Sequence, residues 1–271
     1  MQSPTTLTIT SPGTVIEAAP LTREAFAPFG DVIENQRPDV HPSSASAHPC
    51  LPFDGISANQ SSAIKYQHVS RNINLYDQAP SGQPGQPVMN MFVCAARARI
   101  PPPPQTDPAP TRPRPRPPPP TPLRAPPLLL PSTFPVSVLE RHPYTTQTFI
   151  PLTPPHHTPA TQQHHTYLVI VAPTLPAPGP DSTLPVPTRI PSPSTHYPRP
   201  LPGPGLPDLA RLRAFVATRA QAVTYAAGTW HAPMVALGAA GTAVDFVVVQ
   251  FANGVAGEDC QEVVLASSGA G

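Results

Sequence analysis

Charged residues and long apolar runs are scarce in this 271-residue chain. Only 11% of the residues are charged and the formal net charge is +1, so the chain lacks the basic surface that nucleic acid or an anionic membrane requires. No apolar run reaches the ~20 residues that a membrane-spanning helix needs. These absences exclude nucleic acid and the membrane from the expected partners.

Cysteine is also rare. Cys50, Cys94 and Cys260 are odd in number, widely spaced and without a Cys-x-x-Cys pair, which argues against a disulfide framework and a zinc site. The first ten residues have neither the basic nor the apolar region of a secretion signal. We therefore expect a soluble, reduced, cytoplasmic protein.

Proline is abundant instead, with 47 residues, of which 17 lie in residues 101–135 and 13 in residues 173–207. Proline removes a backbone donor and keeps its predecessor extended, so neither segment suits a helix or a central strand. We expect two polyproline-like or disordered insertions in a single domain spanning residues 15–271. The alternative is a scaffold protein in which these segments bind SH3 or WW domains.

Outside the proline-rich segments, short strands dominate the pattern. Thr22 is a possible N-cap of a short helix, and Asp208–Val216 has the apolar spacing of a helix or helical turn. Period-two or continuous apolar patterns predict strands at Ile64–Ser70, Val88–Ala95, Val136–Glu140, Gln147–Leu152, Thr166–Ala172 and Gln221–Tyr225. Met234–Leu237 and Val244–Phe251 are expected to form a hairpin across Gly238–Gly241. The fold class is therefore all-β, a barrel or sandwich with few helices.

Two distant motifs carry the candidate chemistry. Glu140-Arg141-His142-Pro143 is followed by Gln147, and Gly228-Thr229-Trp230-His231 comes about ninety positions later. The spacing copies the two motifs of a cupin-type β-barrel, with Glu140 at the first histidine position and Gln147 at the glutamate position. The same four side chains, Glu140, His142, Gln147 and His231, overlay the cupin metal-ligand positions. Glutamine is a poor ligand for nickel or manganese, so a divalent ion stays optional at this point.

Further residues could contact a substrate. Lys65, the only lysine, shares a face with Gln67 on its predicted strand and either points into a lumen toward an anion or faces solvent. Trp230 is either core packing or a platform for substrate. Glu140 lies at the end of an apolar strand beside His142, where burial and an imidazolium shift its proton affinity in opposite directions, as acid–base catalysis requires.

These motifs and their flanks resemble the ureidoglycolate lyases of allantoin catabolism, formerly called hydrolases, and the C-terminal segment is similar to fungal members. The resemblance implies a cupin-like β-barrel, commonly a homodimer, that cleaves ureidoglycolate to glyoxylate and urea without an organic cofactor. The segments that carry it are Leu21–Ile33, Leu139–Leu152, Tyr167–Ala172, Pro207–Val216, Val223–Val249 and Phe251–Val263.

The implied reaction needs a base, an acid and a cation. We assign the base to His231 or Glu140, and the acid or an orienting role to His142. The substrate contacts are assigned to Gln147 for the ureido group, to Lys65 or Arg213 for the carboxylate, and to Tyr225 and Trp230. A non-catalytic cupin that binds a small acid is the alternative; it would tolerate loss of Glu140 or His142, so the presence of both favours the enzyme.

Overall fold

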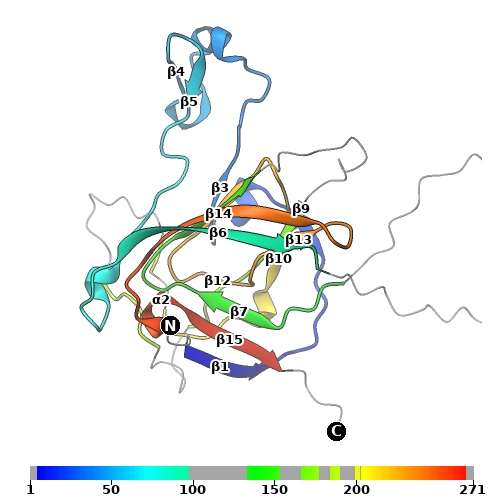
Figure 1. Ribbon diagram of the computed structural model, residues 1–271, viewed down its shortest axis with the longest axis vertical. Coiled ribbons are helices and arrows are strands. Elements are labelled where there is room, and N and C mark those ends of the chain that lie inside the picture. The colour runs from blue at the N-terminus through cyan, green and yellow to red at the C-terminus, as the bar shows by residue number, and fades with distance from the viewer. Residues whose placement is uncertain are drawn as a thin grey trace, which may run out of the picture. The chain divides into compact units, whose positions relative to one another are not determined.

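The computed structural model describes residues 5–97, 133–152, 166–176, 184–189, 199–201 and 203–266. Its secondary structure is mostly strands, arranged in two main sheets (Figure 1). The first proline-rich segment, 101–135, lies almost entirely outside the described residues, so the expectation for it stays a prediction. Within the described ranges, no helix is long and apolar enough to cross a membrane.

Sheet A has eight strands in the order β1-β15-β7-β12-β9-β10-β2, with β13 also paired to β9. Its strands are β1 (Thr5–Thr10), β2 (Ala18–Pro20), β7 (Val138–Arg141), β9 (Thr166–Ala172), β10 (Arg213–Thr218), β12 (Trp230–His231), β13 (Val235–Leu237) and β15 (Gln261–Ala266). Sheet B has the order β3-β11-β8-β14-β6. Its strands are β3 (Gly30–Ile33), β6 (Gln86–Ala95), β8 (Gln147–Leu152), β11 (Ala222–Tyr225) and β14 (Ala243–Ala252).

The remaining elements are short. A separate two-stranded sheet consists of β4 (Ile56–Ala58) and β5 (Ala63–Lys65). The helices are α1 (Arg23–Phe26), α2 (Ala256–Asp259) and the 3-10 turns η1 (Pro42–Ala47), η2 (Pro52–Asp54), η3 (Tyr76–Gln78) and η6 (Leu209–Arg211). Thr22 caps α1 as expected, because its Oγ1 accepts a hydrogen bond from the Ala25 amide at 3.2 Å. The all-β, cupin-like fold class is confirmed, although the pairing among the described strands leaves the sheets open and closes no barrel.

The core lies where the inner faces of the two sheets meet. Alternate residues of β8, β11 and β14 point inward from sheet B and meet residues of β9 and β10 from sheet A. Tyr167 of β9 packs edge-on against Phe246 of β14, with ring centroids 5.1 Å apart. This packing fixes the separation of the sheets and so the space in which the polar motifs lie.

Three local predictions are wrong. Extended backbone after Ala63 ends at Lys65, and His68 has a φ of +52°, so the predicted strand Ile64–Ser70 stops early and Lys65 and Gln67 no longer share a strand face. Only Leu209–Arg211 of the predicted helix is helical, because the chain then pairs with β9 as β10. The predicted hairpin is absent, since β13 pairs with β9 in sheet A whereas β14 pairs with β6 and β8 in sheet B.

The second proline-rich segment, 173–207, also differs from expectation. Described parts of it contact sheet A: the Gln261 side chain of β15 donates to the Pro185 carbonyl at 2.8 Å, and Leu184 is buried. The buried guanidinium of Arg141 donates to the carbonyls of Gly203, Pro204 and Gly205, and its Cζ lies 4.4 Å from the Trp230 ring centroid. Proline carbonyls and glycines here supply acceptors to a buried cation, so this part of the chain is structural.

Candidate active site

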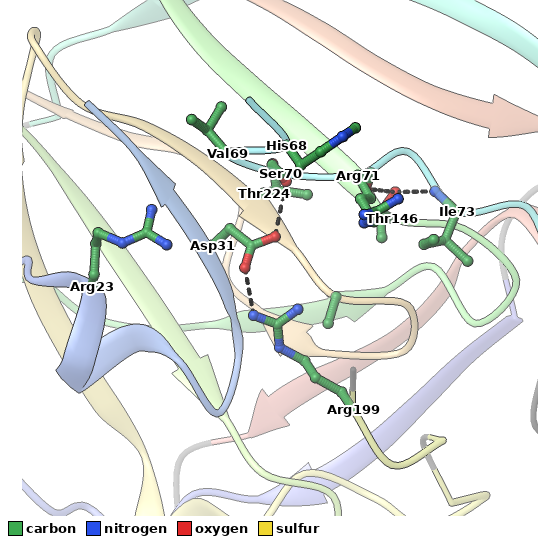
Figure 2. A pocket seen from close by; sticks show the side chains of 11 residues that line it. Arg23, Asp31, His68, Val69, Ser70, Arg71, Ile73, Thr146, Arg199 and Thr224 are labelled. Carbon is green, nitrogen blue, oxygen red and sulfur yellow. Dashed lines mark hydrogen bonds and ion pairs between the residues drawn. The ribbon is translucent and has the colours of Figure 1, made fainter. Parts of the chain in front are cut away.

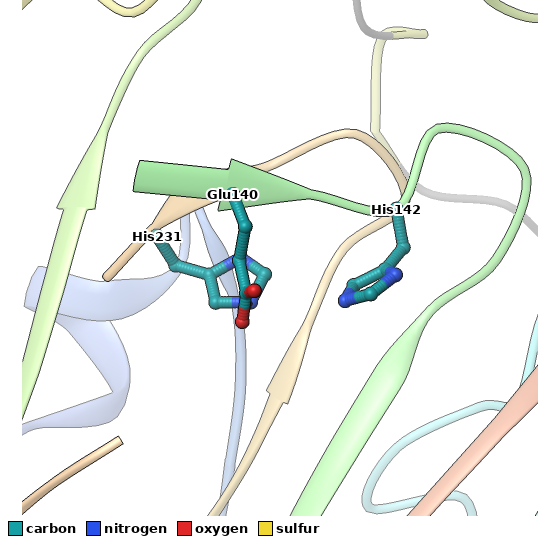
Figure 3. Close-up of side chains that lie close together, drawn as sticks. All are labelled: Glu140, His142 and His231. Atoms are coloured by element: carbon teal, nitrogen blue, oxygen red, sulfur yellow. The ribbon is translucent and has the colours of Figure 1, made fainter. Parts of the chain in front are cut away.

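Strand alternation separates the four residues of the first motif. Glu140 lies in β7 and pairs in register with His231 of β12 and with Glu262 of β15. The side chains of Glu140 and His142 point to the same side, toward His231 (Figure 3), while Arg141 points to the opposite side toward Trp230. The side chains of Glu140 and His142 therefore lie on the His231 side of β7, and the buried guanidinium of Arg141 lies on the other side.

Glu140, His142 and His231 form a compact cluster. The Nε2 atom of His231 lies 3.5 Å from Oε1 of Glu140, and the ring centroids of the two histidines are 5.7 Å apart. One nitrogen or oxygen from each residue lies within 4.8 Å of the others. Both histidines are buried, and the Glu140 side chain is only 20% exposed. The structure therefore brings together all three residues that were predicted to be catalytic.

Backbone carbonyls fix both imidazole rings. Nδ1 of His231 donates to the carbonyl of Thr229 at 2.8 Å, and Nδ1 of His142 donates to the carbonyl of Asp259. Gly228, in the turn before His231, has a φ of +74°, which favours glycine, and its amide donates to the His142 carbonyl at 2.8 Å. The two rings consequently direct Nε2 into the cluster, and Nε2 of His142 is buried without a partner among the described residues.

The electrostatics of the cluster favour an ionised carboxylate and a neutral His142. Burial alone would raise the pKa of Glu140, but the hydrogen bond and charge of His231, together with His142, outweigh it and hold that pKa below its usual value. Burial lowers the pKa of His142, against the opposing effect of Glu140. Near neutral pH, His142 therefore presents a lone pair on Nε2.

Gln147 and Tyr225 complete the inner wall. Oε1 of Gln147 lies 3.2 Å from Nε2 of His231, and Nε2 of Gln147 donates to Oε1 of Gln250 at 2.7 Å. The Tyr225 ring stacks on His231 with centroids 4.0 Å apart and planes 12° apart. Both predicted contacts thus lie at the cluster and hold His231 from two directions.

The other predicted contacts lie elsewhere. Trp230 is buried on the opposite side of β12, where its indole donates to the Gly205 carbonyl at 3.3 Å, so it serves as core packing. Lys65 is exposed in β5 of the separate two-stranded sheet, and Arg213 is exposed at the start of β10. Among the residues that the structure describes, no hydrogen bond or ion pair joins either cation to the cluster.

Three residues near the cluster were missed from sequence. Gln250 interrupts the apolar, inward-facing series Val244, Phe246 and Val248 of β14, and that interruption is the signal that could have found it. Glu262 of β15 and Cys260, which directly precedes β15, have ligating atoms within 4.8 Å of those of Glu140. The carboxylates of Glu140 and Glu262 and the thiol of Cys260 therefore make this end of the site better suited to a cation or a hydrogen-bond donor than to an anion.

The donor set also fits a divalent metal ion. Two imidazole nitrogens and one carboxylate converge, and each imidazole is held through its other nitrogen by a backbone carbonyl, as metal-binding histidines commonly are. The fold and this cluster together place the chain in the class of cupin-like proteins, whose two sheets enclose a small polar site.

Sequence comparison specifies the family within that class. The ureidoglycolate lyase family model matches residues 13–270, so the chain belongs to this family. A ureidoglycolate lyase of Schizosaccharomyces pombe is 33% identical over 246 residues, covering 91% of this chain and 89% of that protein. One from Burkholderia mallei is 29% identical over 230 residues, covering 85% and 78% respectively. One from Saccharomyces cerevisiae is 37% identical over 103 residues, which is 38% of this chain and 35% of that protein.

Proposed function

We propose that this chain cleaves ureidoglycolate to glyoxylate and urea, in purine nitrogen catabolism, by proton exchange between Glu140 and His231. The observation that carries the proposal is the 3.5 Å approach of Nε2 of His231 to Oε1 of Glu140 in an enclosed polar site. Membership of the ureidoglycolate lyase family supports the choice of substrate.

The substrate determines which groups are needed. Ureidoglycolate carries its hydroxyl, carboxylate and ureido nitrogen on one carbon. Removal of the hydroxyl proton lets the C–O bond become a carbonyl while the C–N bond breaks, and the departing nitrogen takes a proton to give urea. No water is consumed, so one base and one acid that lie side by side next to that carbon suffice.

Glu140 is the base in this proposal. Its pKa is held below its usual value despite burial, because His231 and His142 stabilise the carboxylate form. The carboxylate is therefore ionised near neutral pH and accepts the hydroxyl proton.

His231 is the acid. Its Nδ1 faces the Thr229 carbonyl, and its Nε2 faces oxygen atoms of both Gln147 and Glu140, so an imidazolium with two N–H donors satisfies this environment. Nε2 gives its proton to the leaving nitrogen. The proton that Glu140 took from the hydroxyl then passes to Nε2 across the 3.5 Å gap, which restores the starting state.

His142 orients the substrate. Its ring is fixed by the Asp259 carbonyl, and its unpartnered Nε2 is a neutral acceptor for a hydroxyl or ureido N–H of the substrate. Gln147 can turn its amide toward the ureido group because it already lies beside His231. The contact of Lys65 or Arg213 with the carboxylate that the sequence predicts is left out of this proposal, because both side chains are exposed on elements apart from the cluster.

A divalent metal ion would use the same atoms of Glu140, His142 and His231. When bound, it would act as a Lewis acid toward the substrate hydroxyl and carboxylate oxygens. Nε2 of His231 cannot ligate a metal and donate a proton at the same time. An experiment can therefore distinguish a metal ligand from a proton donor at this position. We expect activity to survive prolonged chelation in protein purified without a metal-affinity tag. Loss of activity that is restored by a divalent ion would make the three residues metal ligands instead.

We also propose a homodimer in the cytoplasm. Its support is the outer face of sheet B, where Met89, Met91 and Val93 of edge strand β6 are 77%, 61% and 68% exposed. An uncharged ten-residue edge strand with exposed apolar side chains is a surface that proteins normally cover. Light scattering should give a dimer that Met91→Glu dissociates. The three unpaired cysteines agree with a reducing compartment.

The activity test uses purified chain and racemic ureidoglycolate. We expect release of urea and glyoxylate in equal amounts with consumption of one enantiomer. Turnover of allantoate or allantoin alone would contradict the proposed substrate.

A further inference from the structure

A pocket lies on the outer face of sheet B, apart from the cluster of Glu140, His142 and His231 (Figure 2). Its volume of about 110 Å³ is well above the ~10–15 Å³ that a single water needs. Tyr225 of β11 points inward and stacks on His231, whereas the preceding Thr224 points outward and lines this pocket. The two sites therefore occupy opposite faces of the same strand.

Three arginines from separate parts of the chain line the pocket: Arg23, Arg71 and Arg199. In Figure 2 they are arranged around Asp31, the pocket's only carboxylate. Arg199 pairs with Asp31 at 2.5 Å and also donates to the Gly30 carbonyl at 2.7 Å, so the carboxylate charge is already neutralised. Two guanidinium charges remain without a carboxylate in the pocket.

Two of the arginines are held in place by contacts with neighbouring residues. Arg23 donates to the Val32 carbonyl at 2.6 Å, and its Cζ lies 4.1 Å from the Phe53 ring centroid. Arg199 is fixed by its bonds to Asp31 and Gly30. Arg71 differs, because its half-buried guanidinium has no hydrogen-bond or ion-pair partner among the residues that the structure describes. A pre-positioned pair of cations beside an arginine with open donors suits an anion that accepts several hydrogen bonds.

The remaining polar wall is also ordered. The hydroxyl of Ser70 lies 2.9 Å from both Oδ2 of Asp31 and Oγ1 of Thr224. Thr146 accepts from the Ile73 amide at 2.9 Å, which fixes the segment that carries Arg71. His68, which is exposed, also lines the pocket.

We infer that this outer pocket binds a small oxyanion, a phosphate or a short carboxylate, through Arg71 together with Arg23 and Arg199. The carrying observation is that three arginines line a cavity whose one carboxylate, Asp31, is already paired. The inference is independent of the lyase reaction, because no residue of the pocket belongs to the catalytic cluster.

The test is calorimetric titration of the full chain with inorganic phosphate and, separately, with oxalate at low ionic strength. At least one anion should bind, and Arg71→Gln should weaken its Kd by about tenfold or more, since charge-assisted hydrogen bonds are lost. The matched control is Arg211→Gln, whose exposed guanidinium pairs with Asp208 elsewhere, and it should change Kd by less than about twofold. Binding of phosphate alone or of oxalate alone identifies the source of the anion.

A second variant separates the two sites. His231→Ala should leave anion binding intact. Arg71→Gln should retain its thermal midpoint and lyase activity. A negative result for anion binding would therefore leave the proposed lyase reaction unaffected. The inference is overturned if neither anion binds, or if binding persists in Arg71→Gln and disappears in His231→Ala.

Discussion

The two faces of β11 place opposite kinds of site on one strand. On the inner face, Tyr225 stacks on a histidine whose nitrogens both have oxygen neighbours, within an enclosed cluster. On the outer face, Thr224 borders a pocket where Arg71 has open donors. The inner site is fixed by backbone carbonyls and is suited to moving protons, whereas the outer site has excess positive charge and is suited to holding an anion. Alternation of side chains along a strand is sufficient to create both.

The largest effect is expected on the inner face. His231→Ala should lower kcat by ~10²–10⁴-fold with little change in KM, because an acid acts in the transition state. Release of urea and glyoxylate measures both constants. The control is His41→Ala, since His41 is exposed and only caps η1. A kcat loss below about tenfold would demote His231 to a structural role.

The next largest expected effect is on stability and concerns Arg141. Arg141→Met should lower the free energy of unfolding by about 3 kcal/mol, because three carbonyls of residues 203–205 lose their buried donor. Arg211→Met, at an exposed pair, should cost less than about 0.5 kcal/mol. Urea denaturation compares the two variants. Equal stabilities would show that the described part of the second proline-rich segment does not anchor the sheet.

A smaller effect is expected at Gln250. Gln250→Leu removes the acceptor that sets the amide orientation of Gln147, so kcat/KM should fall by roughly threefold to tenfold while the fold is kept. Steady-state kinetics at constant pH give the value, with exposed Gln83→Leu as the control. An unchanged kcat/KM would mean that Gln147 is oriented by His231 alone.

The smallest effects should come from the exposed cations. Lys65→Ala and Arg213→Ala should each change KM by less than about threefold, because both side chains are exposed on elements apart from the cluster. A larger rise in KM at constant kcat, in either variant, would identify that residue as the partner of the substrate carboxylate and restore the prediction made from sequence.

Local spacing explains what could be predicted from sequence. The Glu140 and His142 alternation and the Gly228 turn before His231 are short-range patterns, so the grouping of Glu140, His142 and His231 could be predicted from them. Strand Thr166–Ala172 was found to the residue because its continuous apolar run is buried.

The wrong predictions of the helix and the hairpin have a common physical cause. The structure of each segment depends on which strand, distant in sequence, it pairs with. Residues 209–216 have helical spacing, yet residues 213–216 pair with β9 and are strand. The hairpin failed because β13 and β14 join different sheets. Arg199 and Gln250 acquire their roles only through partners 103 or more positions away, which no local pattern encodes.

The most direct test of the two-face account is a crystal structure of the chain with the product glyoxylate. The account predicts glyoxylate oxygens beside Nε2 of His142 and Nε2 of His231, with Glu140 facing the aldehyde carbon. Glyoxylate found only in the outer pocket, against Arg71 and Arg199, with none at the two histidines, would contradict the assignment of catalysis to the inner face.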